Sequence, residues 1–150
     1  MYYRIKDNVL IDWNDSQYSD AYLETDIVTQ AELNAHPNKV IVQDGVLVLN
    51  PNYEQEEAEK EAERVGNLTC TKRVFVLMLE QLGFDYFEQI EPLINANRQA
   101  KLEWELCVEL QRKNPLLDTV ASEIGVTSKQ LDDLFKYANG EITQAQFIGE

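Results

Sequence analysis

The alternation of apolar and polar residues predicts two β-hairpins in the first third of the chain. Its strand-forming runs are residues 2–6, 9–13, 40–43 and 46–49. Asp7-Asn8 separates the first two runs and Asp44-Gly45 the last two, and these residue types tolerate the positive φ angles of a two-residue type I′ turn. The two hairpins predict a sheet of about four strands, which must pack on a helix or on a partner to be stable.

The segments around the second hairpin predict a loop, a short helix and a connector. Residues 14–26 are polar and read as a loop, while Thr29 and Glu32 match a capping box whose helix must end near Pro37. Residues 53–66 are rich in helix formers but have almost no apolar face. A helix that is polar on all sides is typical of a solvated connector, so we expect a rigid helix between two lobes.

Apolar positions at helical spacing dominate the rest of the chain. We expect helices over residues 69–82, 85–95 with a bend at Pro92, 97–113, 115–124 and 127–138, and a short sixth helix from Thr143. In the third of these, Leu102, Leu106 and Leu110 recur at every fourth position and predict a buried stripe. Trp104 neighbours this stripe and is expected in the core.

These elements together predict the α+β fold class. We expect a small antiparallel β-hairpin lobe over residues 1–52, a charged connector helix over residues 53–66 and an all-helical bundle of about five helices over residues 67–150.

Charge narrows the range of partners. The 150 residues carry a net charge of -14, and residues 1–66, with 5 basic and 14 acidic side chains, account for -9 of it. A chain this acidic repels phosphate, so we expect no direct nucleic-acid binding.

No run of about 20 apolar residues predicts a membrane span, and the first residues lack the apolar core of a secretory signal. The expected location is therefore the cytoplasm of the producing cell.

The residues that usually perform catalysis are sparse. His36 is the single histidine and precedes a proline, and the chain lacks zinc-ligand spacing, a glycine-rich phosphate loop and a G-x-S-x-G elbow. We therefore expect no enzymatic activity, no cofactor and no metal, while the many carboxylates leave a carboxylate-based enzyme as a remaining alternative. Cys70 and Cys107 lie in apolar patterns that read as helices, and we expect free thiols.

Residues 116–138 match the pattern of a helix-turn-helix. Ala121, Gly125 and Val126 fit the helix crossing and the turn, and Leu131 with Leu134 would anchor the second helix. The outward face of that helix carries two adjacent aspartates at positions 132 and 133, whereas groove readers need basic and amide side chains. Three interpretations remain open: a helical corner in a bundle, a corner that binds protein, and a DNA-binding regulator.

Four segments together resemble small accessory proteins encoded in phage and prophage tail-gene regions. They are MYYRIKDNVLIDW, VIVQDGVLVLNPNY, the charged connector and the block that begins NLTCTKRVF. This resemblance implies a viral or prophage origin and a structural or interaction role, and it assigns no functional residue. It also implies a location in the cytoplasm of a bacterial host, with association with the virion as an alternative. The acidity also resembles that of phage-encoded inhibitors of host defence, such as anti-CRISPR proteins, which implies a nucleic-acid mimic as the alternative function.

The expected partner is a protein, either a phage structural protein or a host defence protein, with a homo-oligomer as an additional expectation. The predicted contact residues are Tyr2, Tyr3, Trp13, Tyr18 and Tyr22 on the sheet, and Glu54, Glu57 and Glu61 on the connector helix. Tyr and Trp are the side chains most often found at binding hot spots. The alternatives are that half of the aromatic residues close the sheet against a helix, and that the glutamates are plain solvated charge.

Overall fold

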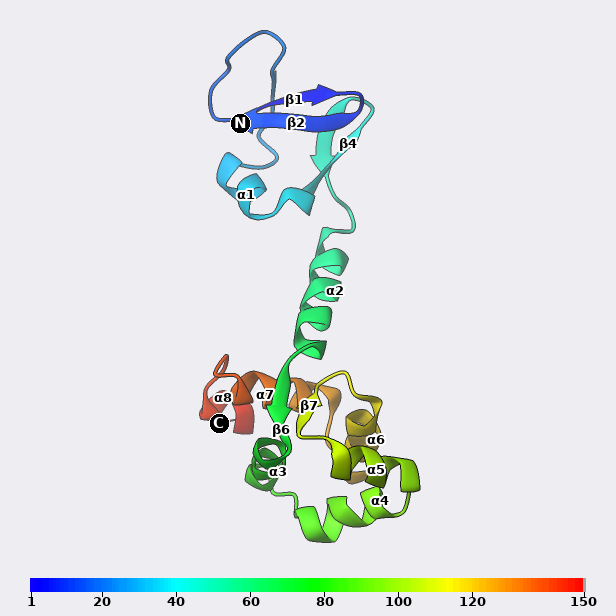
Figure 1. Cartoon of the computed structure of the whole chain (residues 1–150). Helices are drawn as coiled ribbons and strands as arrows, with labels where there is room; N and C mark the ends of the chain where they lie inside the picture. Colours follow the sequence, from blue (N-terminus) through cyan, green and yellow to red (C-terminus); the bar gives the residue numbers. More distant parts are fainter. Residues whose placement is uncertain (150) are drawn as a thin grey trace. The chain divides into compact units, whose positions relative to one another are not determined.

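A computed structural model describes residues 1–149, in which the predicted α+β class is confirmed (Figure 1). The chain divides into two compact units. Unit 1 comprises Met1–Glu59 and unit 2 begins at Lys60, so the boundary falls within the helix α2 (Tyr53–Gly66). Each unit has its own cluster of buried apolar side chains.

Unit 1 contains two small antiparallel sheets. Its elements are β1 (Tyr2–Lys6), β2 (Val9–Asn14), β3 (Leu23–Glu24), α1 (Gln30–Ala35), a 3₁₀ turn (Pro37–Lys39), β4 (Val40–Gln43) and β5 (Val46–Leu49). Both predicted hairpins are confirmed: Asp7, Asn8, Asp44 and Gly45 all have positive φ. The predicted four-stranded sheet is wrong, because the strands form a three-stranded sheet of order β2-β1-β3 and a separate β4-β5 pair.

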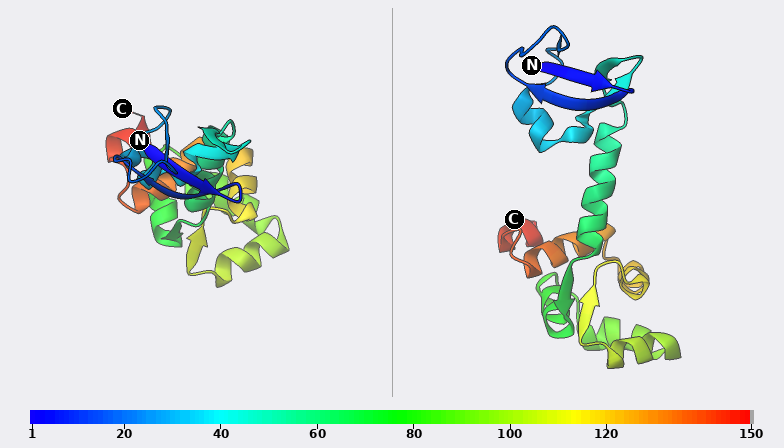
Figure 2. Two further views of the ribbon diagram at one scale, coloured as in Figure 1. Left: turned by 90° about the horizontal axis from the view of Figure 1, so that it is seen from above. Right: turned by 45° about the horizontal axis from the view of Figure 1, so that its top comes forward.

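The core of unit 1 lies between these sheets and α1, which Figures 1 and 2 show on one side of the β1-β2 ribbon. Leu33 from α1 is fully buried among Tyr3, Val40 and Leu47. The capping box predicted at Thr29 and Glu32 is confirmed and fixes the start of α1. The predicted loop over residues 14–26 is wrong at Leu23 and Glu24, which pair with β1 through Tyr3 and Tyr2.

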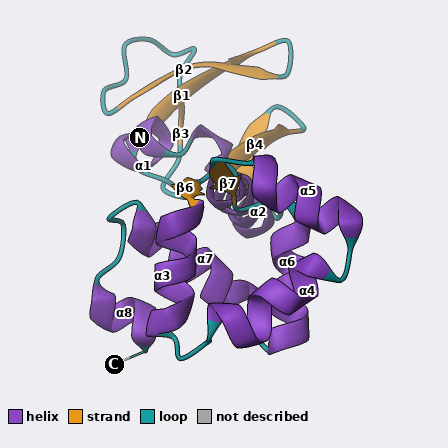
Figure 3. Ribbon diagram, turned by 60° about the horizontal axis from the view of Figure 1, so that its bottom comes forward, coloured by secondary structure: helices purple, strands orange, loops and turns teal. Residues whose placement is uncertain are grey.

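Unit 2 is mostly helical, and Figure 3 shows its helices in purple. Its elements beyond α2 are β6 (Thr69–Thr71), α3 (Lys72–Gln81), a π-helical turn (Tyr86–Ile90), α4 (Glu91–Asn95), α5 (Arg98–Leu106), β7 (Glu109–Gln111), α6 (Pro115–Ile124), α7 (Ser128–Ala138) and α8 (Gln144–Ile148). The helices predicted from Pro115, Thr127 and Thr143 are confirmed, each with its N-cap side chain in place.

Two helix predictions are wrong where a β-ladder replaces them. Residues 69–71 form β6 rather than the first helical turn, and the helix predicted over 97–113 ends at Leu106. The two strands pair through Cys70 and Leu110, so long-range hydrogen bonds outweigh the local helical spacing. Leu110 lies in β7 and is buried, whereas Leu102 and Leu106 in α5 are exposed. The three leucines therefore do not form the predicted buried stripe.

The core of unit 2 is built around aromatic contacts. Trp104 is buried as expected, and its indole N–H donates to the hydroxyl of Tyr86 at 2.9 Å. Phe75 lies edge-on to Trp104 and also contacts Phe135, so α3, α5 and α7 share one packed centre. Phe87 lies in the π-helical turn and is exposed, whereas Ile90 at the end of the same turn is fully buried.

Candidate interaction surfaces

Two of the predicted aromatic contact residues belong to the core side of unit 1. Tyr3 is buried, and its hydroxyl accepts a hydrogen bond from the backbone N–H of Leu47 at 3.3 Å. Trp13 is half-buried opposite Tyr3, and its indole N–H donates to Oδ1 of Asn34 at 2.7 Å. These two side chains close the sheet against α1 and the second hairpin, which is one of the alternatives that the sequence left open.

The other predicted tyrosines lie around a polar cluster. Tyr22 is buried and donates its hydroxyl hydrogen bond to the carboxylate of Asp12, and the Arg4 guanidinium lies 5.5 Å from the centre of its ring. The hydrogen bond to Asp12 is the larger cause, and the loss of solvent around the ring the smaller one, of a raised pKa for Tyr22. Tyr18 lies edge-on to Tyr22 and is exposed, while Tyr2 is half-buried in β1. The five aromatic residues therefore do not form one exposed patch.

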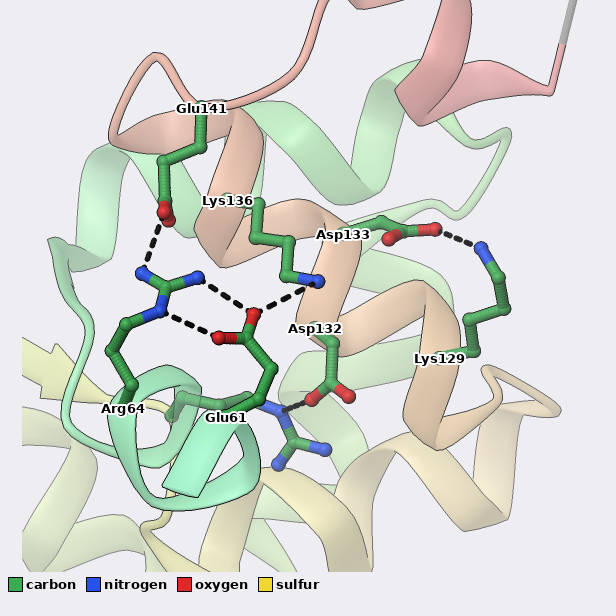
Figure 4. A network of polar contacts seen from close by, with 8 residues as sticks. Glu61, Arg64, Lys129, Asp132, Asp133, Lys136 and Glu141 are labelled. Carbon is green, nitrogen blue, oxygen red and sulfur yellow. Dashed lines mark hydrogen bonds and ion pairs between the residues drawn. The ribbon is translucent and has the colours of Figure 1, made fainter. Parts of the chain in front are cut away.

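The three predicted glutamates of α2 have the i, i+3, i+7 spacing of one helix face, and the boundary between the two units falls between Glu57 and Glu61. Glu54 is exposed, and Glu57 accepts a hydrogen bond from the side-chain amide of Asn38 at 2.9 Å, both in unit 1. Glu61, in unit 2, forms a bidentate ion pair with Arg64 (Figure 4). The contact with Arg64 lowers the pKa of Glu61.

That ion pair belongs to a network that ties α2 to α7 and the turn after it (Figure 4). Arg64 also contacts Glu141 at 2.6 Å, and the Lys136 Nζ lies 3.8 Å from Glu61. The hydrogen bonds to the two glutamates raise the pKa of Arg64. Exposed ion pairs of this kind contribute little to stability, so this network orients side chains more than it stabilises the fold.

Unit 1 contains an apolar hollow, here called the unit 1 cleft. It has a volume of about 280 Å³ and is lined by Val9, Leu10, Trp13, Leu33, Pro37, Val40, Ile41, Val42 and Leu47. Its floor is buried and its walls, which include Val9 and Ile41, are exposed. Trp13 is the one predicted contact residue that lines it. No charged side chain is among its lining residues.

Unit 2 contains a longer apolar surface, here called the unit 2 groove. Two hollows of about 350 and 530 Å³ share Gln99, Glu103 and Asn114, and they lie along α5 and the start of α6. Their apolar lining residues are Leu93, Ala100, Leu102, Leu106, Cys107, Pro115 and Leu116. Leu106 is 79% exposed, and Val108, two residues further along the chain, is 82% exposed.

The sequence pattern missed this groove because it predicted an uninterrupted helix over residues 97–113. In that helix Leu106 would lie on the buried stripe, whereas the helix ends there and the next residues turn into β7. Cys107 and Val108 have low helix propensity, and this was the one available signal that the helix ends early.

The helix-turn-helix-like corner is present in unit 2, and its two adjacent aspartates form ion pairs with other residues of unit 2. Gly125 has a φ of 82° and ends α6, and Val126 is buried beneath the turn. Asp132 contacts the buried guanidinium of Arg112 at 2.7 Å, and Asp133 pairs with Lys129. Both aspartates of the outward face of α7 are therefore already paired, Asp132 with Arg112 and Asp133 with Lys129.

Within residues 1–149 no group of three or more His, Cys, Asp or Glu side chains is arranged to hold a metal ion, and no helix is long and apolar enough to cross a membrane. Cys70 and Cys107 are free thiols, as expected, although neither lies in the interior of a helix. Comparison of the chain with known protein families, with curated proteins and with solved structures found no match.

Proposed function

We propose that this chain is a non-enzymatic protein–protein interaction protein, of the structural or accessory kind that the resemblance to phage tail-region proteins implies, and that it binds its partner through the unit 2 groove. The observation that carries this proposal is the 79% exposure of Leu106, which together with Leu102 and Cys107 lines a hollow whose exposed surface is mainly apolar. Val108, two residues further along the chain, is 82% exposed. Contiguous exposed apolar surface is characteristic of sites where another protein binds.

The charges around the groove indicate the chemistry of the partner. Glu103 lines both hollows, and Glu109 is exposed three residues after Leu106, while Glu105 is paired with Lys101 at 3.8 Å. An apolar centre with a polar rim is the usual organisation of a protein interface. The fitting partner segment therefore presents apolar side chains with lysine or arginine beside them.

Photocrosslinking in cells that produce the protein and its neighbouring gene products tests this proposal. A benzophenone amino acid replaces Leu106 in one variant and Phe87 in the control, since both side chains are exposed in unit 2 but Phe87 does not line the groove. We expect an adduct at position 106 whose mapped peptide carries apolar and basic residues, and none at position 87. Equal adducts at both positions, or none at 106, would contradict the proposal.

A second candidate function is an acidic inhibitor that mimics nucleic acid, and the charge of unit 1 favours it. Unit 1 carries 12 acidic and 3 basic side chains. Such a mimic binds a basic protein in a strongly salt-dependent manner. If the captured partner is a nucleic-acid-binding protein whose affinity collapses between about 50 and 200 mM salt and is unaffected by Leu106→Asp, this second function replaces the first.

A further inference from the structure

Every strand of unit 1 except β1 has one edge with no strand beside it within the described residues, and two of these edge strands are β2 and β4. In the sheet of order β2-β1-β3, β2 has β1 as its one hydrogen-bonded neighbour, and in the second sheet β4 has only β5, within the described residues. An edge strand presents backbone N–H and C=O groups that can accept another strand. Residues from both edges, Trp13 from β2 and Val42 from β4, line the unit 1 cleft.

The turn of the second hairpin shows which groups are available on β4. Beside a two-residue turn, Gln43 and Val46 form a hydrogen-bonded pair, so the next pair, Val42 and Leu47, directs its backbone N–H groups outward. The outward N–H of Leu47 is satisfied, because it donates to the hydroxyl of Tyr3. The outward groups of Val42 have no strand beside them and lie on the edge that borders the cleft.

The cleft is suited to side chains of a peptide. Its volume, about 280 Å³, is at the lower end of the range for small-molecule pockets, about 300–1,000 Å³. Its lining residues carry no charge, and its polar groups are the backbone of two edge strands and the Trp13 indole, which is already bonded to Asn34. An aliphatic side chain of an extended segment would contact Leu33 and Val40 at the floor.

The charge of unit 1 selects between a second copy of this chain and a different partner. Of its 3 basic side chains, Arg4 lies over Tyr22 and Lys39 is paired with Glu32. Pairing β4 with the same strand of a second copy would bring together two units of charge -9 each. A basic segment gains from the same field, so it is the better complement.

We infer that unit 1 binds an extended, lysine- or arginine-containing segment of a partner protein, which adds as a strand to the free edge of β4 and places an aliphatic side chain in the unit 1 cleft. In strand addition the backbone hydrogen bonds supply affinity, and alternate side chains supply specificity. Residues between those that enter the cleft point outward, where basic side chains gain from the net charge of -9 of unit 1. This inference uses unit 1 alone and does not depend on the unit 2 groove.

The test uses the full chain and a synthetic seven-residue peptide of alternating lysine and valine. Binding is followed by NMR through the indole N–H signal of Trp13, because this side chain lines the cleft. The signal is assigned from its absence in the spectrum of Trp13→Phe. We expect the lysine-valine peptide to bind saturably. We expect binding to be at least tenfold weaker for two control peptides, the same peptide N-methylated at alternate residues and a peptide of alternating glutamate and valine. No binding at millimolar peptide, or equal binding of the N-methylated peptide, would overturn the inference.

Variants of the protein locate the site. Val9→Lys places a cation at the mouth of the cleft, and Val42→Pro removes the outward N–H of β4 without removing a β4-β5 hydrogen bond. We expect each to weaken binding at least tenfold, while Val46→Lys, on β5 outside the cleft, leaves it unchanged. If the unliganded chain instead self-associates and Val9→Lys abolishes that association, the edge binds a second copy of the chain and the inference is overturned.

Discussion

The guanidinium of Arg112 and the carboxylate of Asp132 form an ion pair, with Nε 2.7 Å from Oδ1, that joins the turn after β7 to α7 inside unit 2. The Arg112 side chain is only 7% exposed. It also donates to Asp118 on α6 and to the hydroxyl of Ser128 on α7. One buried cation thus holds both helices of the corner against the strand that follows the unit 2 groove.

We expect Asp132→Ala to destabilise unit 2 by about 3 kcal/mol, because it leaves a buried cation with part of its partners missing. Asp133→Asn is the matched control: it removes a pair with Lys129, which is highly exposed, and should cost less than about 0.5 kcal/mol. Urea unfolding followed by Trp104 fluorescence, in a Trp13→Phe background, measures both free energies of unfolding. Similar losses for the two variants would show that Arg112 is not a structural centre.

Substitution by alanine should change the free energy of unfolding differently at Gly125, which follows α6, and at Gly66, the last residue of α2. Gly125 ends α6 with a φ of 82°, so Gly125→Ala should cost about 1 kcal/mol through backbone strain alone, since nothing lies within 4 Å of the added Cβ. Gly66 is helical and its added Cβ meets Lys113 at an ordinary 3.5 Å. Gly66→Ala should therefore be neutral or stabilising by up to about 1 kcal/mol. Thermal unfolding measures both, and the reverse order would contradict the assigned backbone geometry.

The stability of unit 1 should fall in acid through Glu32. Hydrogen bonds from the backbone N–H of Thr29, then from Lys39 and the Thr29 hydroxyl, lower the pKa of Glu32 from 4.5 to about 2. Because the folded-state pKa is depressed, the stabilising contribution is present above about pH 4.5 and is lost as the pH falls through about 2. Carboxyl NMR titration measures this pKa directly. Thr29→Ala removes the hydroxyl and keeps the backbone N–H, so we expect the pKa of Glu32 to rise by only part of this difference, and an unchanged value would contradict the hydroxyl hydrogen bond.

The two thiols should differ in reactivity. Burial raises the pKa of the Cys70 thiol to about 12, so little thiolate forms at neutral pH, and Cys70 is shielded in β6. Cys107 is half-buried and lines the unit 2 groove, with its thiol directed to the carbonyl oxygen of Trp104. A thiol reagent should modify Cys107 in the native protein and Cys70 only on unfolding, as peptide mapping would show. Rapid native labelling of Cys70 would contradict the buried ladder.

Local signals predicted those parts of the fold that local chemistry determines. The turns at Asp7-Asn8 and Asp44-Gly45, the capping boxes and the α6-α7 corner each depend on side chains within a few residues of one another. The β6-β7 ladder pairs Cys70 with Leu110, forty residues apart, and the periodicity of each segment by itself favours helix. Long-range pairing of this kind leaves no local pattern, so the end of α5 was missed.

The same limit explains the outcome for the contact residues. Aromatic content pointed to Tyr3 and Tyr22, but burial of these large rings stabilises unit 1 and removes them from the surface. The exposure of Leu106 follows from the position where α5 ends, which the sequence pattern placed at the wrong residue. Trp13 was identified from its residue type, and its place beside the unit 1 cleft depends on contacts between β2 and β4.

The central claim is that the unit 2 groove binds a protein, and the most direct measurement is the affinity of the purified partner captured at position 106. Isothermal titration compares the wild type, Leu106→Asp and the exposed control Phe87→Asp. Loss of one buried leucine contact corresponds to about 1.5–3 kcal/mol, so we predict at least tenfold weaker binding for Leu106→Asp and no change for Phe87→Asp. Wild-type affinity in Leu106→Asp would contradict the claim.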